Sequence, residues 1–205
     1  NLDITPPFFA PEELMNDYFG EEWNGDDGMG YGYFTNPWGS NEFGQVDFSS
    51  GVGELSFYIM GIADGDYNGE GNQWNCYETS TGVDYIGFEL VSPSNEIYTL
   101  QMSGMIMDTW TIEGDLSEYV LWGEPMIMDC NPHNSVSATL NLPLNSFELG
   151  TYQLRIITSD NAGNVVSFEG DELESLGFLS TLEFTSSTNN VVINPFEDYA
   201  ILTWD

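Results

Sequence analysis

The sequence predicts an all-β sandwich, and three observations support this prediction. Helical periodicity is nearly absent over the 205 residues. Short segments of alternating apolar and polar residues recur along the chain, and clusters of Gly, Asn, Asp and Pro separate them. About eight strands at hairpin spacing are typical of a two-sheet sandwich, and a chain of this length can bury one large core.

The expected strands carry apolar side chains at every second position, so that one face of each strand is buried. They are Gly53–Ile62, Tyr85–Val91, Ile97–Met102, Met105–Ile112, Val136–Leu142, Thr151–Thr158, Val165–Phe168, Leu179–Phe184 and Ala200–Trp204. Helix is expected only over Pro11–Met15 and Asp171–Leu176, the second ended by Gly177. The segment Asn16–Gly44 is rich in Gly and aromatic residues, and we expect a long ordered loop or insertion there.

Three motifs resemble those of tandem bacterial immunoglobulin-like domains of extracellular surface proteins. They are the opening Asp3-Ile4-Thr5-Pro6-Pro7, the strand and Ser-Pro-Ser turn within Gly82–Ser94, and the turn Asp160-Asn161-Ala162-Gly163-Asn164 that follows an expected strand. The resemblance implies an immunoglobulin-like β-sandwich with long loop insertions and an extra C-terminal strand. It also implies an extracellular or cell-surface location, although such a fold does not fix one function. We expect residues 1–187 to form the sandwich and residues 188–205 to form a tail or strand, exchanged with a neighbour.

The charge balance of the chain is unusual because cations are missing. Asp and Glu number 34, whereas Arg155 is the only Lys or Arg, and the formal net charge is −33. No basic patch can form, which excludes binding to nucleic acid or to anionic lipid. No apolar run approaches the roughly 20 residues that a membrane helix needs. The acidity indicates either bound metal cations or simple solubility in a salty medium.

Two cysteines, Cys76 and Cys130, lie far apart in the sequence and do not have the spacing of a metal finger. In a secreted chain they are expected to form a disulfide, which would stabilise the fold by about 4 kcal/mol in the chain-entropy model. The alternative is a pair of buried thiols, since the redox compartment is itself inferred.

A calcium site is expected in the segment after the first long strand. Oxygen-bearing side chains alternate there, and Gly69 stands at the sixth position, as in the first half of a calcium loop. The predicted ligands are Asp64, Asp66, Asn68, Glu70, Asp84 and Asp160. The twelfth position is Asn75 rather than Glu, so the loop is not an EF-hand, and a solvated acidic turn is the alternative.

The sequence offers no usable catalytic set, and we expect the protein not to be an enzyme. His133 is the only histidine, and no Gly-x-Ser-x-Gly segment is present. Adjacent acidic pairs such as Glu12-Glu13 arise by chance in a chain with this many carboxylates.

Two functions are consistent with these features of the sequence. The apolar segment Ala200, Ile201, Leu202 and Trp204 favours a self-assembling subunit of a surface fibre or appendage, a homo-oligomer or polymer that adds this strand to a neighbouring sheet and binds calcium. The alternative is an accessory carbohydrate-binding module in which Trp23, Trp38 or Trp74 stacks on a glycan. These aromatic side chains can also serve as core or interface anchors.

Overall fold

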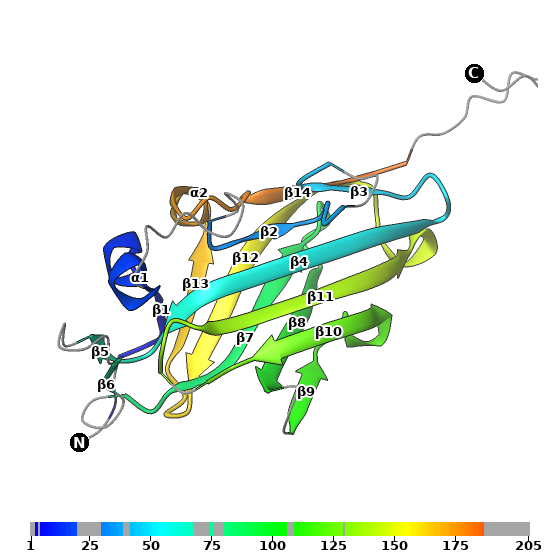
Figure 1. The fold of residues 1–205 in the computed structure, drawn as a ribbon. Helices are drawn as coiled ribbons and strands as arrows, with labels where there is room; N and C mark the ends of the chain where they lie inside the picture. Colours follow the sequence, from blue (N-terminus) through cyan, green and yellow to red (C-terminus); the bar gives the residue numbers. More distant parts are fainter. Residues whose placement is uncertain are drawn as a thin grey trace, which may run out of the picture.

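The computed structural model describes residues 3, 5–19, 30–38, 42–67, 74–75, 80–105, 109–128 and 130–186. Two β-sheets pack face to face and enclose the core, as Figure 1 shows. This arrangement confirms the predicted all-β sandwich.

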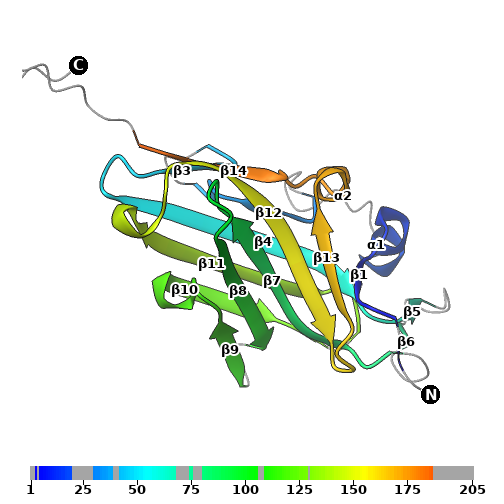
Figure 2. The ribbon, with the colours of Figure 1, turned by 180° about the vertical axis from the view of Figure 1, so that it is seen from behind.

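The strands of each sheet come from distant parts of the sequence. The first sheet contains β1 (Phe8–Phe9), β2 (Gly32–Phe34), β4 (Val52–Ala63), β11 (Asn134–Pro143) and β10 (Val120–Met126). The second contains β3 (Gln45–Asp47), β14 (Thr181–Thr185), β12 (Gly150–Asp160), β7 (Val83–Val91), β8 (Ile97–Gly104) and β9 (Trp110–Glu113), with β13 (Val165–Glu169) beside β12. The second sheet faces the viewer in Figure 2. A separate two-stranded sheet pairs β5 (Asp66–Tyr67) with β6 (Trp74–Asn75).

The first sheet is organised around the antiparallel pair of β4 and β11, which runs from Val52 opposite Pro143 to Ile62 opposite Asn134. The other side of β4 is covered in two steps, by β2 along Phe57–Ile59 and by β1 along Ile62–Ala63. Between β2 and β4 the chain crosses to the second sheet, where β3 pairs in parallel with β14.

Aromatic rings fill the space between the sheets. Phe57 of β4 lies against Phe88 of β7, with ring centroids 4.9 Å apart, and Phe34 contacts both rings. Tyr152 of β12 stacks on Phe184 of β14 at 4.0 Å. These side chains are almost fully buried, so their transfer from water contributes about 2 kcal/mol each to folding.

In the described part of the chain, two α-helices and two 3₁₀ turns accompany the strands. The helix α1 (Glu12–Phe19) begins where Pro11 accepts backbone hydrogen bonds from Leu14 and Met15, and α2 (Asp171–Ser175) follows β13. The 3₁₀ turns are Ser117–Tyr119 and Leu144–Ser146. Both helices lie toward the same end of the sandwich in Figure 1.

Most of the expected strands are present, with shifted ends, but one was wrong and others were missed. Residues 105–112 do not form one strand, because β8 continues to Gly104 and β9 begins only at Trp110. Met105 instead makes an isolated bridge to Met126. Strand β2 lies inside the expected insertion 16–44, and β1, β3 and β10 were not predicted. The expected strand Ala200–Trp204 lies outside the described residues.

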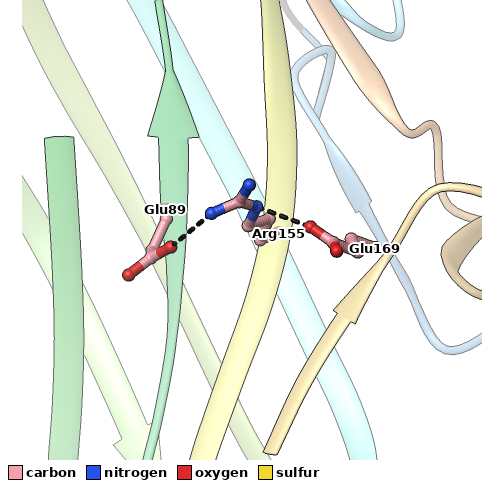
Figure 3. Close-up of polar contacts among 3 residues, drawn as sticks. All are labelled: Glu89, Arg155 and Glu169. Carbon is pink, nitrogen blue, oxygen red and sulfur yellow. Dashed lines mark ion pairs between the residues drawn. The ribbon is translucent and has the colours of Figure 1, made fainter. Parts of the chain in front are cut away.

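The only Arg of the chain lies on the outer face of the second sheet. Arg155 of β12 places its Nη1 3.5 Å from Glu89 Oε2 of β7 and its Nε 2.6 Å from Glu169 Oε2 of β13, as Figure 3 shows. These are cross-strand neighbours in register. Because the three side chains are partly exposed, each ion pair contributes at most about 1 kcal/mol.

A buried tyrosine ties the loop before β12 to the strand itself. The Tyr152 hydroxyl donates a 3.0 Å hydrogen bond to the carbonyl oxygen of Glu148, four residues upstream. The side chain of Tyr152 is 0% exposed. The bond therefore fixes the direction in which the chain enters the core strand.

We predict that Tyr152→Phe lowers the free energy of unfolding by about 1 kcal/mol, since it removes the hydrogen bond between the Tyr152 hydroxyl and the Glu148 carbonyl. Tyr98→Phe is the matched control, because its hydroxyl bonds the exposed Glu96 carboxylate and its loss should cost under about 0.5 kcal/mol. Urea denaturation measures both, and equal losses in the two variants would contradict the role of the bond.

Candidate metal site at the N-terminal end of the sandwich

Three carboxylates meet at one end of the sandwich. Asp3 belongs to the N-terminal arm (residues 3 and 5–7, before β1), Asp64 follows β4, and Asp160 is the last residue of β12. One oxygen of each lies within 4.8 Å of the others. Three segments that are remote in the sequence therefore converge on one point.

Asp64 is placed by the end of β4 and is only 1% exposed. Its Oδ2 accepts hydrogen bonds from the backbone N–H groups of Gly82, at 2.7 Å, and Thr81, at 3.2 Å. The pKa of this carboxyl is raised to about 6, chiefly by burial and also by the neighbouring Asp3 and Asp160, although the two N–H donors lower it. A buried carboxylate with this environment is stabilised by a cation.

Asp3 fastens the N-terminal arm to the sandwich. Its Oδ2 accepts from the N–H of Thr81, at 2.9 Å, and from the hydroxyl of the same residue, at 3.1 Å. Its Oδ1 accepts from the N–H of Thr5, and its carbonyl lies 3.4 Å from Asn164 Nδ2. The arm is thus held by the same groups that surround Asp64.

Asp160 organises the turn that it begins. Its Oδ1 accepts from the N–H groups of Ala162, at 2.9 Å, and Asn164, at 2.8 Å, while Oδ2 accepts from Asn164 Nδ2 at 2.6 Å. Gly163 has φ of 87°, which few other residues adopt. The Asp-Asn-Ala-Gly-Asn segment is a turn, as its sequence predicts, and its structure presents the Asp160 carboxylate to the cluster.

The cluster has the chemistry of a site for a hard divalent cation. Carboxylate oxygens are the ligands that calcium prefers, and calcium tolerates irregular geometry. With all three groups ionised, three negative charges are close together, two of them on buried side chains. Backbone N–H donors offset only part of this repulsion, so a bound cation or a shared proton would stabilise the site.

The cluster contains two of the six ligands expected from the sequence, Asp64 and Asp160. Asp84 lies at the start of β7 with its side chain exposed, and it does not belong to the cluster. Asp66 pairs with Asn75 through the backbone, and its side chain, like Asn68 and Glu70, lies outside the described residues. Sequence reasoning did not assign Asp3 to the site, although Asp3 opens one of the motifs on which the resemblance rests.

The other candidate residues are only partly described. Cys130 is fully buried, and its backbone carbonyl accepts from the N–H of Asp64 at 3.1 Å. Its expected partner Cys76 lies outside the described residues, so the disulfide stays a prediction. Burial lowers the pKa of His133, which lies in the turn between Cys130 and β11. Trp38 is exposed, Trp23 lies outside the described residues, and only the backbone of Trp74 is described.

Comparison of the chain with protein-family models, with curated proteins and with solved structures found no match. In the described part of the chain, no helix is both long enough and apolar enough to span a membrane.

We predict that calcium raises the thermal midpoint of the protein and that Asp64→Asn weakens calcium binding at least tenfold, or about 1.4 kcal/mol. Asp84→Asn is the control, because it removes an exposed carboxylate outside the cluster. Titration calorimetry and thermal unfolding measure both effects. A loss with Asp84→Asn equal to that with Asp64→Asn would contradict the placement of the site.

A second prediction concerns pH in the absence of metal. The pKa of Asp64 is about 6 in the folded protein, above the ordinary value of 3.8, so the stability that its protonated carboxyl contributes is full below the unfolded pKa and is lost as the pH rises through 6. In chelator, Asp64→Asn should therefore gain stability relative to the natural protein by about 1 kcal/mol between pH 5 and pH 7. Denaturant unfolding at the two pH values measures this difference, and a difference that does not change with pH would contradict it.

Proposed function

We propose that this chain is a non-catalytic structural and adhesive module outside the cell. In this proposal it is a subunit of a surface fibre or appendage that assembles with copies of itself through a terminal strand and bound calcium.

The order of the strands supports the immunoglobulin-like character of the module. In the first sheet β4, β11 and β10 follow the strands β1 and β2, and in the second sheet β14, β12, β7 and β8 are neighbours. This corresponds to the A-B-E-D and G-F-C-C′ order of immunoglobulin sandwiches. The hydrogen bond from Tyr152 to Glu148 lies at the start of the strand equivalent to F, where those sandwiches have a tyrosine corner.

The observation that carries the proposal is the placement of the two ends of the sandwich. Asp3 and Asp64 lie beyond one end of β4, whereas Thr185 pairs with Asp47 near the other end (Figure 1). A strand of twelve residues spans about 36 Å. A module whose N-terminal arm lies at one end, and whose last described strand finishes at the other, suits a linear arrangement of copies.

The charge of the chain supports a role for cations in such an arrangement. Each copy carries a net charge of −33, so contacts between copies are repulsive unless cations lie between them. The cluster of Asp3, Asp64 and Asp160 lies at the end through which the N-terminal arm joins the sandwich. Calcium held there would fix the arm and lower the repulsion at this end.

The terminal strand is proposed because the last described strand already has two partners. β14 pairs with β12 on one side and with β3 on the other. β14 therefore offers no free edge to the apolar segment Ala200, Ile201, Leu202 and Trp204. Added to the sheet of a neighbour, they would form backbone hydrogen bonds and bury their side chains.

We predict that removal of residues 188–205 abolishes assembly in calcium and leaves the thermal midpoint of the sandwich within about 2 °C. The double variant Ile201→Asp/Trp204→Asp should also fail to assemble. The control is the double variant Asn189→Asp/Asn190→Asp, which adds the same charge upstream and should still assemble. Sedimentation velocity in calcium and in chelator measures the size distribution. Assemblies of truncated chains as large as those of full chains would refute the terminal strand.

A further inference from the structure

The outer face of the first sheet carries aromatic and hydroxyl side chains in two adjacent rows. One row, across paired strands, is Tyr33, Tyr58, Ser137 and Glu124, and the next is Ser56, Thr139 and Trp122. Side chains directly opposite one another on paired strands point to the same face. The hydroxyls of Ser56 and Thr139 lie 3.0 Å apart, which confirms the alignment of the second row. In Figure 1 this face is toward the viewer, and neither described helix covers it.

A β-bulge brings two apolar side chains to the exposed edge of this face. The register of β10 on β11 shifts between Val120 and Trp122, so Leu121 has no partner residue on β11. As a result the consecutive side chains of Leu121 and Trp122 are 64% and 52% exposed, where regular alternation would bury one of them. Bulges that re-aim side chains in this way are common beside binding sites.

The same edge is poorly suited to an added strand. The bulge disrupts the row of backbone groups, and Pro125 has no N–H to donate. At the end of β10 the next residue, Ile127, already donates its N–H to the carbonyl of Gly104 at 3.1 Å. Strand exchange therefore does not account for the exposed Leu121 and Trp122.

The chemistry of the face selects its occupant. The net charge of −33 repels nucleic acid, acidic polysaccharides and anionic lipid. Thr139, Ser137 and the exposed Asn141 next along β11 supply neutral donors and acceptors beside an exposed indole. The carboxylates of Glu124 and Glu54, opposite Ser137 and Asn141, add acceptors for hydroxyl groups. Binding sites of this kind combine aromatic surface with a few polar groups that fix orientation. A neutral sugar chain matches this set, because its rings have apolar faces and its edges carry hydroxyl groups.

We propose that the outer face of β4, β11 and β10 binds a neutral polysaccharide, with the Trp122 indole stacked on a sugar ring and Thr139, Ser137 and Asn141 hydrogen-bonding its hydroxyls. This site lies on the broad face of the sandwich and not at its ends. It is independent of the proposed assembly, and truncated chains lacking residues 188–205 should retain it.

The test is affinity electrophoresis of the full chain in gels that contain hydroxyethylcellulose, xylan, mannan or starch, with alginate as the acidic comparison. We expect retardation by at least one neutral polymer and none by alginate. Trp122→Ala should weaken binding to that polymer at least tenfold, and Trp122→Tyr should retain part of it. Trp110→Ala is the matched control, since Trp110 is 40% exposed on β9 of the other sheet. This variant should bind the polymer as tightly as the natural chain does.

Thermal unfolding shows whether Trp122→Ala remains folded, and Thr139→Ala, which leaves the exposed edge unchanged, provides a second variant that should also bind less tightly. Retardation by none of the neutral polymers overturns the proposal, as does equal loss in the Trp110 and Trp122 variants. If sedimentation shows that Trp122→Ala abolishes self-association, the face is an interface between copies and the proposal of a polysaccharide site is overturned.

Discussion

A chain with a single cationic side chain must keep its carboxylates hydrated or neutralise them from outside. Arg155 is the only Lys or Arg, and it already lies between Glu89 and Glu169. Among the described residues, Asp64 and Asp160 are the only buried acids, and they are neighbours. The same shortage of cations that leaves most acids on the surface therefore concentrates the unfavourable electrostatics of the fold at one point, where a cation would relieve them.

Because ion pairs are scarce, neutral hydrogen bonds fix the connections between strands. The buried Asn134 donates from Nδ2 to the carbonyls of Ile62 and Asn131 and accepts from the N–H of Met128. Thr158 donates its hydroxyl to the carbonyl of Tyr85, which joins β12 to β7. Such bonds do not depend on ionic strength as surface ion pairs do. These connections between strands are thus insensitive to salt, whereas the acidic cluster at the N-terminal end is sensitive to it.

The sequence predicted what regular alternation encodes and missed what tertiary contacts decide. β4 and β12 have strict apolar periods, whereas β10 contains Gly123, Pro125 and a bulge, so its pattern does not indicate a strand. Asp64 was expected at the site because it opens a segment of alternating oxygen-bearing side chains, and Asp160 because it was expected at the same end of the sandwich. Asp3 was not, since only the pairing of β1 with β4 brings the arm to the end of the sandwich. Asp84 does not lie in the cluster, because its side chain at the start of β7 is exposed.

The protection of the edges bears on how such a module can associate without aggregating. An exposed strand edge pairs with any available strand, and polymerisation requires that only one edge do so. The bulge and Pro125 make the edge of β10 unsuitable for pairing with a further strand, and β9 is only four residues long. β14 is enclosed between β12 and β3. If copies join through a terminal strand, the acceptor edge must therefore lie elsewhere in the sandwich. The broad face that contains Trp122 would then remain free along the whole fibre.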